Sequence, residues 1–179
     1  MGKSTSASPA TRRKLLTRLF GTGLVLGAVE SSATAQSSII FTQKGSISIA
    51  GANLLVTVAL AKAAEIGVPM SVAVVDESGI LKAFSRMDGA GVATVDIVQN
   101  KAYTAAAFRS STQALAQRSQ DLPTQIASFA TTPHVTLLPG GLPISVGGVV
   151  IGGIGAGGGS GEQDALVAQT ALSKVLGIG

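Results

Sequence analysis

The fold is decided by residues 141–176, which have the sequence GLPISVGGVVIGGIGAGGGSGEQDALVAQTALSKVL. Two apolar runs, Leu142–Val146 and Val149–Ile154, flank the dipeptide Gly147-Gly148. This dipeptide readily supplies the positive φ angles that both central positions of a tight hairpin turn favour. The two runs are therefore predicted to pair as antiparallel strands.

A helix is predicted directly after this hairpin. Ser160 and Gln163 have the spacing of a capping box, which favours a helix over Glu162–Leu176. A second hairpin is predicted upstream, where the apolar run Met70–Val75 is followed by turn residues and by Ile80–Arg86. Hairpins favour an antiparallel sheet that helices must cover, so the sequence predicts the α+β class.

The remaining elements are predicted from apolar spacing and from residues that break helices. Three more helices are expected, at Ser46–Glu65, Thr94–Arg109 and Gln113–Gln120. Leu122-Pro123 is expected to break the chain. Residues 128–139 are ambiguous, a loop with strand character near residues 135–138.

Glycine is concentrated at the predicted C-terminal hairpin, since eleven of the 23 glycines lie between Gly140 and Gly161. Such density is typical of backbone that approaches another surface closely. We expect that surface to be a ligand or a neighbouring subunit. The candidate contacts are Gly140, Gly141, Gly153 and Gly155.

Gly153–Gly158 matches the G-x-G-x-x-G pattern of dinucleotide sites, between a predicted strand and a predicted helix. That fingerprint also requires a further strand carrying an acid, whereas here the predicted helix is the last element. Glu162 and Asp164, in the first turn of that helix, would repel a phosphate. These observations disfavour a dinucleotide site.

Composition excludes several classes of site. The chain has 179 residues, no Cys, no Trp and one His, which excludes disulfide frameworks, thiolate metal sites and multi-histidine zinc centres. The net charge of +4 is carried by residues 1–35, because the rest of the chain has eight basic and eight acidic residues. We expect a polar lead-in at residues 36–45 and a single domain at 46–179. A neutral domain gives no reason to expect a nucleic-acid partner.

Residues 1–35 have the pattern of an export signal. Arg12 and Arg13 directly precede an apolar run, and Ala33 and Ala35 form an A-x-A cleavage pattern. The run is shorter than the roughly 20 apolar residues that span a bilayer. We therefore predict an exported, periplasmic or extracellular protein that is not an integral membrane protein. The paired arginines favour the twin-arginine route; a disordered or amphipathic arm is the alternative.

Few side chains could carry chemistry. Lys101 lies in an otherwise apolar predicted helix, where a lysine can act as a base or bind an anion. An ion pair with an acid such as Asp76 or Asp88, or a lysine that snorkels to solvent, is the alternative. Tyr103, the single tyrosine, could ligate iron or donate a hydrogen bond, or pack in the core. His134, the single histidine, is either a ligand or a solvated loop residue.

Six short motifs occur in order along the chain, and together they resemble the extracellular haem-binding and glycolate-operon G protein family (GlcG/HbpS-like). The motifs are residues 72–76, 86–90, 100–105, 140–144, 150–155 and 162–164. The resemblance implies a profilin-like, three-layer α/β/α fold with a five-stranded antiparallel sheet. It also implies a homo-oligomer, often an octamer.

With the export signal, the resemblance implies a secreted protein that captures or buffers haem. Haem degradation, redox sensing with a sensor kinase and delivery to a haem-uptake partner are further roles that it implies. The candidate haem contacts are Lys101, Tyr103, Thr104 and His134, and tyrosine and histidine are among the usual haem-iron ligands. Two other functions stay open. One is an enzyme acting on a small organic acid or aromatic compound in a subunit-interface pocket, with Lys101 as base, and the other is a ligand-free structural or signalling oligomer.

Overall fold

The computed structural model describes residues 42–177. The predicted export signal, with Arg12, Arg13, Ala33 and Ala35, lies outside these residues and stays a prediction. The described helices and strands are, in chain order, α2 (Ile49–Glu65), β1 (Ser71–Asp76), β2 (Leu81–Arg86), α3 (Thr94–Phe108), α4 (Thr112–Ser119), α5 (Pro123–Thr131), β3 (Gly141–Val146), β4 (Val149–Gly157) and α6 (Gly161–Leu176).

The strands form one antiparallel sheet in the order β2-β1-β4-β3. Both predicted hairpins are present, and Gly147 and Gly148 join β3 to β4 with φ angles of 59° and 79°. At the centre of the sheet, β1 pairs with β4 from Ser71 opposite Gly157 to Asp76 opposite Gly152. The predicted α+β class with an antiparallel sheet is confirmed.

The sheet of the described residues has four strands, whereas the resemblance implied five. Within the described stretch before α2, residues 42–48, one backbone hydrogen bond reaches the sheet, from the Ile47 N–H to the Ile151 carbonyl oxygen at 2.9 Å. The stretch with strand character at residues 135–138 forms no ladder. Its Thr136 N–H donates to the hydroxyl of Thr104 at 2.9 Å. Neither segment therefore supplies the repeated backbone bonds that a strand requires.

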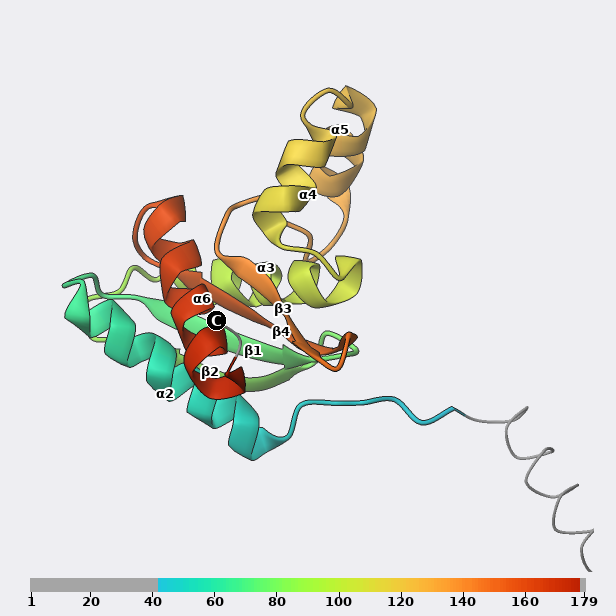
Figure 1. Ribbon diagram of the computed structural model, residues 1–179. Coiled ribbons are helices and arrows are strands. Elements are labelled where there is room, and N and C mark those ends of the chain that lie inside the picture. The colour runs from blue at the N-terminus through green and yellow to red at the C-terminus, as the bar shows by residue number, and fades with distance from the viewer. Residues whose placement is uncertain (1–41, 178–179) are drawn as a thin grey trace, which may run out of the picture. The chain divides into compact units, whose positions relative to one another are not determined.

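Helices cover both faces of the sheet, with α2 and α6 on one face and α3 on the other (Figure 1). The side chains of β1 alternate between the faces. Val72 and Val74 belong to the larger core under α2 and α6, and Ala73 and Val75 belong to the smaller core under α3. The arrangement is therefore three layers of α/β/α, and the central strand is buried on both sides.

Local caps set the ends of the helices. The capping box before α6 is present, since the Ser160 hydroxyl accepts from the Gln163 N–H at 3.3 Å and the Gln163 side chain accepts from the Ser160 N–H at 2.8 Å. The first helix begins slightly later than predicted. Ser48, rather than Ser46, is its cap and accepts from the Gly51 N–H at 3.1 Å.

Two short helices, α4 and α5, project beyond the end of α3 and away from the sheet (Figure 1). The break predicted at Leu122-Pro123 separates α4 from α5, a helix that the sequence did not predict and that begins at Pro123. Proline is tolerated in the first turn of a helix because its missing N–H has no partner at that position. No residue of α5 is buried among the described residues, so this helix adds little to the core.

Candidate functional site

The helix α3 positions three of the predicted site residues, and it directs their side chains to different parts of the molecule. Lys101 extends toward β4 and α6. Tyr103 lies beside the turn between β1 and β2, and Thr104 contacts the loop after α5. Residues that are close in sequence therefore belong to different environments, and they do not form one site.

Lys101 is 2% exposed and forms an ion pair with Asp164, which is 4% exposed. The Lys101 Nζ lies 2.6 Å from Asp164 Oδ2 and 2.8 Å from the carbonyl oxygen of Ala156. Asp164 Oδ1 accepts from the Gly159 N–H at 3.0 Å. The partner acid is thus Asp164, and not the Asp76 or Asp88 considered from the sequence. The sequence signal for it was an acid in the first turn of a capped helix.

Because Lys101 is buried and paired, it joins α3, β4 and α6 and offers no amine to a ligand. A base must be able to reach the proton that it removes. The structure therefore removes Lys101 from the candidate haem contacts, and it removes the general base from the proposed small-acid enzyme. Its role is to hold the layers together.

The glycines of the C-terminal hairpin approach α3 of the same chain. A Cβ atom on Gly153 would collide with the carbonyl oxygen of Ala102, and one on Gly155 would collide with that of Val98. Gly141 faces the Lys101 carbonyl oxygen in the same way. The glycine density predicted that this backbone approaches another surface closely. We expected that surface to be a ligand or a neighbouring subunit, but at these three positions it is α3 of the same chain.

Gly140 is also enclosed by its own chain. Its φ is 109°, and a Cβ there would lie 2.6 Å from the Cβ of Asp164 and 2.8 Å from the Ala156 carbonyl oxygen. Gly140 therefore leaves room for the buried ion pair.

A small hollow opens on the other side of α3, and we call it the Tyr103–His134 hollow. Its volume is about 240 Å³. The lining residues come from β1 and its turn, from α3 and from the loop after α5: Val75, Gly79, Ile80, Leu81, Gln99, Asn100, Tyr103 and His134. The structure thus brings together the single tyrosine and the single histidine of the chain. Their ring centroids are 5.6 Å apart and their planes are tilted by 59°.

The floor of the hollow is the turn between β1 and β2. Asp76 Oδ1 accepts from the N–H groups of Ser78 and Ile80, both at 3.0 Å, and this fixes the turn. Gly79 has a φ of 81°, and a Cβ there would lie 2.5 Å from Cδ2 of Tyr103. Glycine therefore lets the tyrosine ring pack directly on the backbone. Sequence reasoning identified the turn but not this contact.

The turn carries negative charge. The hydroxyls of Ser46 and Ser78, together with backbone hydrogen bonding, hold the pKa of Glu77 below its usual value. Asp76 Oδ2 lies 4.0 Å from Nζ of Lys82 on β2. Asp76 and Glu77 thus lie where β1 turns into β2.

His134 is held in an unusual backbone conformation. The Val135 N–H donates to the Thr132 carbonyl oxygen at 3.3 Å, which closes a turn with Pro133 second and His134 third. His134 has a φ of 64°, at a turn position that favours glycine or asparagine. A side chain kept at such a position is a common mark of a functional residue.

Thr104 is fully buried and contacts the loop that carries His134, so the structure also removes it from direct contact with haem. Its hydroxyl accepts from the Thr136 N–H at 2.9 Å and faces the carbonyl oxygens of Asn100 and His134 at 2.7 and 3.3 Å. Of the four candidate haem contacts, Tyr103 and His134 line the hollow.

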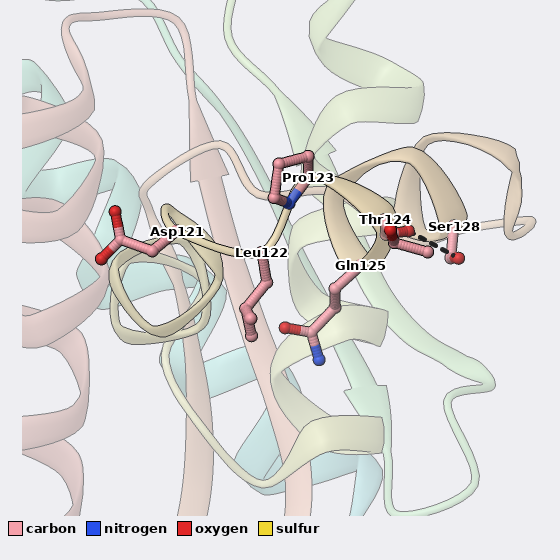
Figure 2. Close-up of a pocket in the computed structure, with 6 residues that line it drawn as sticks. All are labelled: Asp121, Leu122, Pro123, Thr124, Gln125 and Ser128. Atoms are coloured by element: carbon pink, nitrogen blue, oxygen red, sulfur yellow. Dashed lines mark hydrogen bonds between the residues drawn. The ribbon is translucent and has the colours of Figure 1, made fainter.

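A second hollow, of about 430 Å³, lies where α4 meets α5 (Figure 2). Its lining residues are Asp121, Leu122, Pro123, Thr124, Gln125 and Ser128. Leu122 and Gln125 extend to one side, whereas the Asp121 carboxylate points away from them (Figure 2). The Ser128 hydroxyl donates to the Thr124 carbonyl oxygen at 2.8 Å. No group of chemically reactive side chains converges in this hollow.

Residues 42–177 lack two further features. No helix in that range is long and apolar enough to cross a membrane. Within the same range, no group of three or more His, Cys, Asp or Glu side chains could hold a metal ion.

Comparison with known proteins agrees with the fold and with the resemblance. Residues 47–173 match the model of a family described as haem degrading protein HbpS-like. An uncharacterized 15.0 kDa protein of the dhaT-dhaS intergenic region of Citrobacter freundii is 39% identical over 131 residues, 73% of this chain and 92% of that protein.

Two similar crystal structures bear on function. That of HbpS has a TM-score of 0.70 and 32% identity, with 76% of this chain and 94% of that chain covered. That of a PduOC:heme complex has a TM-score of 0.65 and 30% identity, with 72% and 94% covered. The matched family model covers most of the described residues, and the motifs of the C-terminal hairpin lie within it. The chain therefore belongs to the HbpS-like haem degrading protein family.

Proposed function

We propose that the protein binds haem at the Tyr103–His134 hollow, as a capture or buffering protein. One observation carries this proposal. The fold brings the single tyrosine and the single histidine of the chain, far apart in sequence, to a ring separation of 5.6 Å at one hollow. The description of the family and the heme complex of the relative PduOC support the same ligand.

The chemistry of the lining residues fits haem. Tyrosine and histidine are both established ligands of haem iron. Ile80 and Leu81, at the edge of the hollow, are 64% and 44% exposed and offer apolar surface to a flat macrocycle. Pockets that enclose a drug-sized ligand usually measure about 300–1,000 Å³. The hollow is smaller, at about 240 Å³, so it accepts one edge of the macrocycle and leaves the rest over Ile80 and Leu81.

Five of the residues that line the hollow have distinct parts in this proposal. Tyr103 and His134 supply an oxygen and a nitrogen donor. Gly79 lets the tyrosine ring pack on the turn, which orients its hydroxyl. Ile80 and Leu81 exclude water from the apolar face of the ligand. When bound, haem supplies the redox chemistry of its iron, which the side chains of this chain lack.

The test is a hemin titration of the chain from Gln36 onward, followed by absorbance. The expected result is a saturable shift of the Soret band. The affinity for hemin is expected to fall at least tenfold in Tyr103→Phe or His134→Asn. The matched control is Phe84→Leu, which alters the core under α3 and leaves the lining of the hollow intact. A flat titration of the unaltered chain would refute the proposal.

We propose further that the protein assembles into a homo-oligomer, an octamer, through α5. A nine-residue helix is marginal in water unless an apolar face is covered. In the described chain no residue of α5 is buried, and Leu122 and Ile126 remain exposed. Light scattering after size exclusion should give the octamer mass, and Ile126→Glu should reduce it. A monomer at micromolar concentration in the unaltered chain would contradict this assembly.

We also propose export, on the pattern of residues 1–35. An Arg12→Lys and Arg13→Lys double variant is expected to stay in the cytoplasm, as measured by fractionation and immunoblotting. Equal export of the variant would eliminate the twin-arginine route. Loss of export after Ala33→Leu, with retention of the uncleaved chain, would locate the cleavage site.

A further inference from the structure

Thr104 is a buried residue of α3 whose hydroxyl contacts the loop carrying His134. Its hydroxyl accepts from the Thr136 N–H at 2.9 Å, and its proton faces the carbonyl oxygens of Asn100 at 2.7 Å and His134 at 3.3 Å. One hydroxyl therefore contacts the loop on both sides of Val135. It also reaches the backbone of Asn100, which lines the Tyr103–His134 hollow.

The loop needs such an anchor. His134 is in the left-handed region, with a φ of 64°, which is an unfavourable conformation for a non-glycine residue. Loop residues relax from such a conformation unless surrounding contacts hold them. The backbone hydrogen bond from Val135 to Thr132 is long, at 3.3 Å. Among the hydrogen bonds of residues 42–177, those with Thr104 join His134 and Thr136 to α3.

We propose that Thr104 is a positioning residue that holds His134 against Tyr103 and so sets the geometry of the ligand site. This inference rests on the proposed haem function for its ligand readout, but the position of His134 can be measured without haem. Thr104 is fully buried, so it acts through the loop and not by touching the ligand.

Three variants test the inference. Thr104→Val removes the hydroxyl and keeps the shape, whereas Thr104→Ser keeps the hydroxyl. Thr112→Val is the matched control, because Thr112 is also fully buried and its hydroxyl accepts from the Gly141 N–H at 3.1 Å, away from the hollow. Both valine variants remove one hydroxyl that serves a backbone N–H, so each is expected to lower the thermal midpoint to a similar extent.

The first readout is the imidazole proton signal of the single histidine in the ligand-free protein. The Tyr103 ring, 5.6 Å away, shifts this signal from its position in an unstructured peptide. Thr104→Val is expected to move the signal toward the unstructured position. Thr104→Ser and Thr112→Val are expected to leave it in place. An unchanged signal in Thr104→Val would overturn the inference, whether or not the protein binds haem.

The second readout is the hemin titration. Thr104→Val is expected to weaken hemin binding about tenfold, the effect of one or two lost buried hydrogen bonds, and to shift the Soret maximum. Thr104→Ser and Thr112→Val should stay within twofold of the unaltered chain. Equal weakening in Thr112→Val would assign the effect to stability alone and overturn the inference. No binding by the unaltered chain would instead refute the proposed function, and the histidine signal would still decide the role of Thr104.

Discussion

The two sides of α3 are built in opposite ways. On the side facing the sheet, the helix backbone lies directly on the glycines of β4, and Lys101 forms a buried ion pair with Asp164. On the side facing the β1–β2 turn, the Tyr103–His134 hollow is open to solvent. The same helix thus has a closed side without space and an open side with unfilled space.

The difference separates stability from binding. Residues on the closed side have their polar groups paired and their volumes filled, so changes there should affect unfolding. Residues on the open side line unfilled space, so changes there should affect ligand affinity. Substitutions on the two sides of α3 should therefore differ in how much they change the free energy of unfolding.

The largest effect is expected at the buried ion pair. Lys101→Met leaves the Asp164 carboxylate buried without its partner, which should cost about 3–5 kcal/mol of unfolding free energy. Adding Asp164→Leu removes the unpaired charge and should recover most of that loss. Urea unfolding of both variants measures this. A loss of less than about 1 kcal/mol in Lys101→Met would show that solvent reaches this ion pair.

The next effect is expected where α3 lies on β4. Gly155→Ala places a Cβ against the Val98 carbonyl oxygen and 2.8 Å from the Ala102 nitrogen. Backbone cannot move as cheaply as a side chain, so we expect a loss of about 2–3 kcal/mol from overpacking. Thermal unfolding measures it, with Gly147→Ala as a reference, since that turn glycine has no atom within 4 Å of a Cβ. Gly147 has a positive φ, whereas Gly155 does not. A loss at Gly155 no larger than that at Gly147 would mean that β4 and α3 accommodate the added Cβ at little cost.

A smaller loss is expected at the floor of the hollow. Gly79→Ala introduces a Cβ 2.5 Å from Tyr103 and strains a φ of 81°, which should cost about 1–2 kcal/mol. Unlike the two variants above, it should also displace the tyrosine ring and alter its near-ultraviolet circular dichroism. If stability falls as expected but the spectrum is unchanged, the loss comes from strain in the turn and not from displacement of the Tyr103 ring.

The smallest effect on stability is expected at His134. Asparagine tolerates the left-handed conformation better than histidine, so His134→Asn should leave the unfolding free energy unchanged or raise it by up to about 0.5 kcal/mol. Differential scanning calorimetry beside the hemin titration gives both quantities. If His134→Asn is more stable but no longer binds hemin, His134 serves ligand binding at the expense of stability. A destabilised one would place His134 among the structural residues.

Much of the fold was predictable because its signals are local. The glycine pair between β3 and β4 and the capping box before α6 each act within a few residues, and both appear in the structure as expected. The strand count was not predictable in that way. It depends on whether the segments around Ile47 and Thr136 form repeated backbone bonds with a strand. In the described residues Ile47 makes a single backbone bond to β4, and the Thr136 N–H donates to the Thr104 side chain.

The site was only partly predictable for the same reason. Residue type alone identified Tyr103, Thr104 and His134 as candidates. The neighbouring sequence does not indicate that Tyr103 and His134 line a hollow and that Thr104 is buried. Lys101 was recognised as unusual inside an apolar helix, yet its partner lies 63 positions away on another element. Long-range pairings of this kind are set by the topology of the sheet.

The pairing of Ser71 with Gly157 at the centre of the sheet has a consequence for how the chain folds. The two central strands are separated by more than half of the domain, so the chain must close a long loop before it gains their contacts. Domains dominated by such distant contacts fold slowly. During synthesis, β1 has no partner on its inner edge until β4 has been made. The sheet can therefore form only after most of the chain has been synthesised. Loss of β4 and α6 would remove one of the two central strands.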